Sequence, residues 1–230
     1  RIRAVLFTGS TEVAQSINRT LAQRGAAEHC SLPLVAETGG QNAMIVDSSA
    51  LTEQVVQDVL TSAFDSAGQR CSALRVLCLQ DDIADRVLDM LKGAMQELQI
   101  GIPDRLCTDI GPVIDEDARA ALSDYIAQAS GHALEVFRLP LPQACRRGSF
   151  VAPAVIVIDD FSRLKHEVFG PVLHVLRYRR QDLGRLVAQI NASGYGLTLG
   201  IHSRIDETVE AIVAQAHVGN IYVNRNMVGA

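Results

Sequence analysis

Five consecutive apolar residues, Ala154–Ile158, constrain the fold of this sequence more than any other feature. A strand that is apolar on both faces must be buried on both faces, which is typical of a parallel sheet covered by helices. Similar short apolar runs alternate along the chain with segments such as 51–63 and 83–98, in which apolar residues recur at helical spacing. Alternating strands and helices predict an α/β fold with a mostly parallel sheet.

The same patterns predict the individual elements. We expect strands at 5–7, 33–36, 43–46, 74–79, 154–158, 172–178, 197–202 and 220–223. We expect helices at 51–63, 83–98, 118–130, 183–191 and 208–216, and a first helix that is capped by Ser10 or Thr11 and ends near Arg24, before Gly25. The proline-containing stretch 132–148 is interpreted as a hairpin.

Composition excludes several classes of protein. With 48% hydrophobic and 20% charged residues the chain is that of an ordinary globular protein, and its net charge of −5 argues against sequence-independent nucleic-acid binding. No apolar run approaches the roughly 18 residues of a membrane span, and no signal-peptide pattern is present. Its five cysteines form no CxxC pair, which favours free thiols over disulfides or a metal site; they are Cys30, Cys71, Cys78, Cys107 and Cys145.

Cys71 is the cysteine whose surroundings indicate chemistry. It follows Gly-Gln-Arg at 68–70 and precedes two small residues, an open and cation-flanked setting that favours a reactive thiolate. A separate carboxylate, Glu37, ends an apolar run 34 positions upstream and precedes Thr-Gly-Gly. A nucleophile with a separate acid–base carboxylate is what covalent catalysis on a carbonyl requires.

A third feature lies near the beginning of the sequence. The strand at 5–7 leads through Thr-Gly-Ser into a helix, and such a turn presents backbone N–H groups and a helix N-terminus to an anion such as a pyrophosphate.

Four short motifs occur in order: Phe-Thr-Gly-Ser at 7–10, Glu-Thr-Gly-Gly at 37–40, Gly-Gln-Arg-Cys at 68–71 and Glu-Val-Phe-Gly-Pro at 167–171. Together this set resembles the aldehyde dehydrogenase superfamily over nearly the whole chain. The runs 36–50 and 222–230 narrow the resemblance to the L-glutamate γ-semialdehyde (Δ1-pyrroline-5-carboxylate) dehydrogenase module of the bacterial proline utilization A family.

The resemblance implies roles for residues around the reacting carbonyl. Cys71 would add to the aldehyde to give a thiohemiacetal, its backbone N–H would donate to the oxyanion, and Glu37 would activate water against the resulting thioester. Ser72, Gly229 and Ala230 would bind the carboxylate of the substrate. The reaction implied is the oxidation of glutamate γ-semialdehyde to glutamate, the second step of proline catabolism.

The resemblance also implies NAD as cofactor. Gly9 and Ser10 would contact its pyrophosphate, Val13 would lie near the adenine, Glu167 would bond the nicotinamide ribose, and Phe169 would pack near that end. In this family an FAD-dependent proline dehydrogenase module precedes the dehydrogenase on one cytoplasmic bacterial polypeptide, which is expected to form a homo-oligomer. The resemblance leaves open whether that parent attaches peripherally to the inner membrane or binds DNA.

We therefore expect residues 1–36 to be the remnant of a Rossmann-like NAD-binding domain and residues 37–230 to be the catalytic domain, truncated before its tail. The asparagine that supplies the family's second oxyanion donor, and the residues that hold the adenine ribose, lie upstream of this sequence. The isolated chain is accordingly expected to be inactive or nearly so.

The sequence leaves three alternatives open. Cys71 and Glu37 would serve equally in a dehydrogenase for another ω-semialdehyde. Cys71 paired with a histidine, for which His166 is one candidate, would give a cysteine acyl hydrolase that needs no nicotinamide. An unreactive Cys71 would leave a non-catalytic assembly module.

Overall fold

The computed structural model describes residues 2–28 and 32–229, which divide into two compact units, residues 1–39 and 40–230. The first unit contains β1 (Val5–Thr8), α1 (Thr11–Glu28) and β2 (Leu34–Glu37). Its two strands are parallel, with Thr8 opposite Glu37, so both strands end at the same edge. The division lies three residues beyond the predicted boundary, and it places Glu37 in the first unit.

The second unit is built on a seven-stranded sheet with the order β5-β6-β7-β4-β3-β8-β9. Neighbouring strands are parallel except for β5, which pairs antiparallel with β6 at one edge. The predicted α/β fold with a mostly parallel sheet is confirmed. The strands are β3 (Ala43–Val46), β4 (Val76–Gln80), β5 (Glu135–Arg138), β6 (Ala154–Ile158), β7 (Val172–Tyr178), β8 (Thr198–His202) and β9 (Asn220–Val223).

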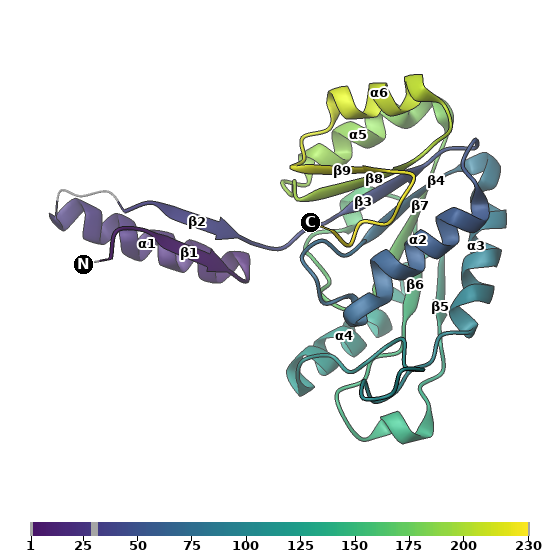
Figure 1. The fold of residues 1–230 in the computed structure, drawn as a ribbon, viewed down its shortest axis with the longest axis horizontal. Helices are drawn as coiled ribbons and strands as arrows, with labels where there is room; N and C mark the ends of the chain where they lie inside the picture. Colours follow the sequence, from purple (N-terminus) through teal and green to yellow (C-terminus); the bar gives the residue numbers. More distant parts are fainter. Residues whose placement is uncertain (1, 29–31, 230) are drawn as a thin grey trace. The chain divides into compact units, whose positions relative to one another are not determined.

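Helices cover both faces of this sheet. The step from β3 to β4 through α2 and the step from β8 to β9 through α6 run in opposite directions along the sheet. Because parallel crossovers are right-handed, these helices must lie on opposite faces, and Figure 1 shows α2 and α3 on one face and α5 and α6 on the other. The helices are α2 (Thr52–Phe64), α3 (Asp81–Gln96), α4 (Glu116–Ala129), α5 (Leu183–Ala192) and α6 (Asp206–Gln215).

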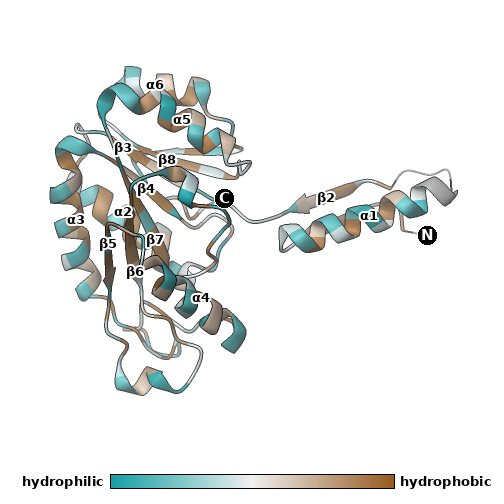
Figure 2. Ribbon diagram, turned by 180° about the vertical axis from the view of Figure 1, so that it is seen from behind, coloured by the Kyte–Doolittle hydropathy of each residue, from teal (hydrophilic) through white to brown (hydrophobic). Residues whose placement is uncertain are grey.

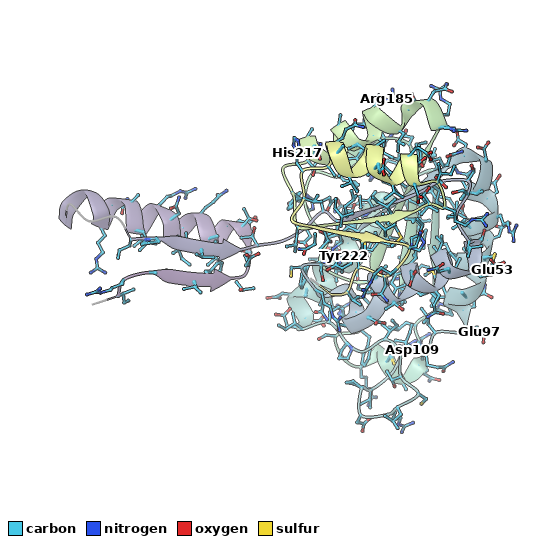
Figure 3. All side chains as sticks on the ribbon, turned by 45° about the horizontal axis from the view of Figure 1, so that its top comes forward. Glu53, Glu97, Asp109, Arg185, His217 and Tyr222 are labelled. Carbon is cyan, nitrogen blue, oxygen red and sulfur yellow. The ribbon has the colours of Figure 1, made fainter. Side chains whose placement is uncertain are left out.

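The core lies between the sheet and these helices. Every residue of β3, β4, β6 and β8 is buried, as their apolar sequences predict, and Figure 2 shows brown strands beneath helices with teal outer faces. Charged side chains such as Glu53, Glu97 and Arg185 lie on the exposed surface (Figure 3). Among the described residues, no helix has the length and apolar character to cross a membrane.

Most predicted elements agree with the structure to within two residues at each end, and two differ by more. The stretch 132–148 is not a hairpin, because β5 pairs with β6 and the remainder contains a 3₁₀ turn at Gln143–Arg146. The prolines after β5 lack the N–H groups that a second strand would need. Helix α1 continues through Gly25 to Glu28, since one glycine costs a helix only about 1 kcal/mol relative to alanine.

Candidate active site

The loops that carry Cys71 and Glu167 meet at one edge of the sheet. Cys71 lies in the loop before β4, and Glu167 lies in the loop before β7. Strands β4 and β7 are parallel neighbours, with Val76 opposite His174, so the two loops enter the sheet side by side. The fold therefore brings together two motifs that are almost 100 residues apart in the sequence.

Three successive residues of the Cys71 loop adopt left-handed backbone conformations. Ser66, Ala67 and Gly68 have φ values of 56°, 53° and 65°. The two residues with a Cβ pay roughly 1–2 kcal/mol each for this conformation. At the third position only glycine fits, because a Cβ there would lie 2.1 Å from the carbonyl oxygen of Gly170. The strained turn leads to Cys71, which is partly exposed.

Asn42 holds the turn that contains Cys71. Its Nδ2 donates to the carbonyl oxygens of Cys71 at 2.7 Å and Ala73 at 2.9 Å, and its Oδ1 accepts from the backbone N–H of Thr198. This side chain is buried. Asn42 is not among the site residues predicted from the sequence, although a polar residue directly before a buried apolar strand is a signal that could have indicated it.

Arg75 is a second site residue that was not predicted from the sequence. Its side chain is 1% exposed, and its Nη2 lies 3.1 Å from Oε1 of Glu167. The guanidinium carbon also lies 5.1 Å from the ring centroid of Phe169, which is cation–π distance. By contrast Arg70, which directly precedes the cysteine, is exposed and donates from Nε to Oγ of Ser66.

Glu167 is a half-buried carboxylate under two opposing influences. Burial raises its pKa above the usual range, whereas the Arg75 charge and the backbone N–H of Gly40 lower it. Burial likewise lowers the pKa of Arg75, and the charges of Glu167 and Cys71 oppose that effect. The directions of both shifts show that the Nη2–Oε1 contact offsets only part of the cost of burying each charge.

Glu167 and Phe169 line a cavity of about 290 Å³ between α4 and the loop before β7. The ring of Phe169 is 46% exposed, although large aromatic side chains are usually covered. The walls are mainly apolar and include Gln69, Ile114, Leu122, Tyr125, His166 and Val168. An apolar cavity with one carboxylate at its wall suits a flat ring whose attached sugar carries hydroxyl groups.

Ser72 and Gly229 lie on segments that are both anchored to Ser62 of α2. The backbone N–H of Leu74 donates to the carbonyl of Ser62, and the N–H of Met227 donates to its Oγ at 3.0 Å. Ser72 is buried. Ala230, the other predicted carboxylate-binding residue, lies outside the described residues.

The first unit presents its predicted site residues at the carboxyl end of its two strands. The N–H of Gly9 donates to the carbonyl of Glu37, and Oγ of Ser10 accepts from the N–H of Val13 at the start of α1. The predicted cap at Ser10 is thus confirmed. Glu37 is exposed, as is Val13. A capped helix N-terminus beside a glycine turn is a ready anion site.

All 230 residues match the family described as "Aldehyde dehydrogenase family". This chain belongs to the aldehyde dehydrogenase family. It is 61% identical to the bifunctional protein PutA of Escherichia coli, over 100% of this chain and 18% of that protein. It is 32% identical to the 1-pyrroline-5-carboxylate dehydrogenase of Bacillus mycoides, over 100% of this chain and 44% of that protein.

Solved structures of the aldehyde dehydrogenase family show the same fold. A crystal structure of a bifunctional proline utilization A protein has a TM-score of 0.94 and 54% identity, over 99% of this chain and 22% of that one. A Thermus 1-pyrroline-5-carboxylate dehydrogenase with bound NAD has a TM-score of 0.89 and 31% identity, over 99% of this chain and 44% of that one. The chain therefore spans about a fifth of the bifunctional relatives and under half of the dehydrogenases.

Proposed function

We propose that this chain supplies the nucleophile and the nicotinamide-ribose carboxylate of an NAD⁺-dependent L-glutamate γ-semialdehyde dehydrogenase. The observation that carries the proposal is the meeting of the Cys71 and Glu167 loops at one sheet edge, in a chain 61% identical to a bifunctional PutA protein. His166 is exposed, and its ring contacts the ring of Tyr125 edge-on. This position gives no support to a cysteine hydrolase built on that histidine.

In this mechanism Cys71 loses its thiol proton to solvent, and the thiolate Sγ forms a bond to the aldehyde carbon as the C=O π bond opens. The carbonyl oxygen becomes an oxyanion that the N–H of Cys71 stabilises. NAD⁺, when bound, supplies the hydride acceptor. Loss of hydride from the thiohemiacetal carbon leaves a thioester on Cys71. Glu37 is proposed to take a proton from the water that cleaves this thioester, which releases the acid and regenerates the thiol.

Each unit carries its own set of residues that are proposed to contact the cofactor. In the first unit, Gly9 and Ser10 suit a pyrophosphate because they directly precede an 18-residue helix, and Val13 is exposed on the first turn of that helix. In the second, Glu167 suits the ribose hydroxyls and Phe169 the nicotinamide end, because both line one cavity. The bound NAD of the Thermus relative supports the choice of cofactor.

The remaining assignments concern the substrate and the parent protein. Ser72 and Gly229, with Ala230, are proposed to bind the α-carboxylate of the semialdehyde. The bifunctional relatives support a longer parent chain of which this chain is one part. From the family resemblance alone we propose that this parent carries a proline dehydrogenase module with FAD, forms a homo-oligomer and lies in the bacterial cytoplasm. By the same proposal, residues 1–36 are part of a Rossmann-like NAD-binding domain, and the chain alone has little or no activity.

NADH formation by the complete protein that contains this chain tests the proposal. Glutamate semialdehyde is compared with succinic semialdehyde and acetaldehyde, and Cys71→Ala is compared with Cys107→Ala, which removes an exposed thiol elsewhere. We expect activity on glutamate semialdehyde that is lost only in Cys71→Ala. Equal activity on all three aldehydes would contradict the substrate, and an active Cys71→Ala would contradict the mechanism.

A further inference from the structure

We propose that Arg75 is a positioning residue that locks the Cys71 loop and the Glu167 carboxylate into one geometry, so that nucleophile and cofactor carboxylate are set by a single side chain. This inference rests on the proposed function, because it concerns the same nucleophile and the same carboxylate. It adds a residue that contacts neither the substrate nor the reacting atoms in the mechanism above.

The contacts of the Arg75 guanidinium divide between the two loops. On the Cys71 loop, Nη1 lies 2.6 Å from the carbonyl oxygen of Gly68 and Nη2 lies 3.0 Å from that of Arg70. On the other loop, Nη1 lies 3.2 Å from the carbonyl oxygen of Gly170 and Nη2 lies 3.1 Å from Oε1 of Glu167. The guanidinium therefore bridges the two loops. Its partners on the Cys71 loop are five to seven residues from Arg75 in the sequence, and its partners on the Glu167 loop are 92 to 95 residues away.

Both loops are shaped to admit this bridge. The backbones approach so closely at Gly68 that a Cβ there would lie 2.1 Å from the carbonyl oxygen of Gly170. Two carbonyl oxygens that converge on one point repel each other unless a donor lies between them, and Nη1 of Arg75 is that donor. The left-handed residues Ser66 and Ala67 precede this contact, and such strain persists only where the surroundings over-determine the backbone.

A bridge of this kind is costly if its only purpose is packing. A buried charge must recover its lost hydration, and well-packed apolar residues often stabilise a fold as well or better. The Arg75 pair differs from a closed core ion pair because the Glu167 side chain keeps 14% of its surface exposed, at the wall of the cavity beside Phe169. Arg75 thus holds one carboxylate oxygen while the carboxylate remains accessible to a ligand.

Lysine cannot reproduce this arrangement. The guanidinium presents donors in a planar fork, whereas the ammonium of lysine is a compact point charge on a flexible stem. Arg75→Lys keeps a positive charge near Glu167 but cannot direct parallel donors to three carbonyl oxygens and a carboxylate. The two variants Arg75→Lys and Arg75→Gln therefore separate charge from geometry.

The test is steady-state kinetics of the complete enzyme with glutamate semialdehyde and NAD⁺, on wild type, Arg75→Gln, Arg75→Lys, Glu167→Gln and the double variant Arg75→Gln/Glu167→Gln. Arg86→Gln is the matched control, since Arg86 pairs with Glu53 on the surface and both are about two-thirds exposed. A thermal melt of each variant verifies folding. A wild type that forms no NADH would refute the proposed function and, with it, the role of Arg75 that rests on that function.

With an active wild type we expect Arg75→Gln to raise KM for NAD⁺ about tenfold and to lower kcat about a hundredfold, since a displacement near 1 Å can cost that much. When Arg75→Gln is added to Glu167→Gln, KM for NAD⁺ should change little further, because Arg75 acts on the cofactor through Glu167. The added substitution should still lower kcat, because Arg75 acts on Cys71 through the carbonyl oxygens of the Cys71 loop. Arg75→Lys should restore KM in part and kcat little.

Three results would overturn the inference while leaving the function intact. The first is wild-type kinetics in a folded Arg75→Gln variant. The second is a rise in KM for NAD⁺ that is equally large with and without the Glu167 carboxylate. The third is a kcat in Arg75→Lys equal to that of wild type. This third result would overturn the inference even if Arg75→Gln does not fold.

Discussion

His174 is a buried neutral histidine, and its replacement by glutamine should reduce the sensitivity of the fold to acid. The ring is 1% exposed, with Nε2 2.8 Å from the hydroxyl of Tyr125 and Nδ1 3.3 Å from the carbonyl oxygen of Arg75. Burial, assisted by the positive charge of Arg75, lowers the pKa of His174 from 6.5 to about 4, although the carbonyl contact opposes the shift.

The sign follows from proton binding. Between pH 4 and 6.5 the unfolded chain binds a proton at His174 that the folded chain excludes, so the free energy of unfolding falls as the pH is lowered through this window. At 1.36 kcal/mol per pKa unit, the full loss below pH 4 is about 3.4 kcal/mol, and the loss at pH 5 is about 2 kcal/mol.

The assay is urea unfolding followed by far-ultraviolet circular dichroism at pH 7 and at pH 5, because the chain contains no tryptophan. Between these values wild type should lose about 2 kcal/mol more than His174→Gln. The exposed His132→Gln is the matched control and should follow wild type. Equal losses in wild type and His174→Gln would show that this histidine is not held neutral by burial.

Other predictions concern the Cys71 loop and a control position. Gly68→Ala should lower the melting temperature sharply, because φ at Gly68 is +65° and the new Cβ would lie against Gly170. Gly93→Ala should raise the free energy of unfolding by about 0.5–1 kcal/mol, because its new Cβ meets no atom within 4 Å. A melt in which both variants behave alike would contradict the close approach. Asn42→Ala leaves the Cys71 turn without its donors and should cost about 1–3 kcal/mol in urea unfolding, together with most of the NADH-forming activity of the complete enzyme. Full activity would show that the turn does not need this side chain.

Much of the second unit could be predicted because its strands are short apolar runs between clear turn signals. The bounds predicted for β3, β6, β7 and β9 coincide with those observed. The hairpin at 132–148 failed for a related reason, since the partner of β5 is β6 and not a neighbouring segment of the same stretch. Local patterns show where a strand lies and not which strand it joins.

The motif residues were accessible from the sequence, but the residues that hold them were not. Nothing local distinguishes Arg75 from any arginine at the start of a strand, because its partners Glu167 and Gly170 lie more than 90 residues away. Asn42 likewise gains its role from Cys71 and Thr198, which are distant in the sequence. The predicted catalytic, cofactor and substrate roles remain predictions for the experiments above.

The Cys71 loop is held largely through its main chain, and this has a consequence for its tolerance of substitution. Asn42 and Arg75 bind carbonyl oxygens of Gly68, Arg70, Cys71 and Ala73, atoms that every amino acid possesses. A saturation scan should therefore find Arg70 replaceable by many residues. Insertion or deletion of a residue anywhere from Gly68 to Arg75 should abolish activity, because such changes shift the carbonyl oxygens away from their donors. Apart from Gly68, Cys71, Ser72 and Arg75, this segment must preserve its spacing more than the identity of its side chains.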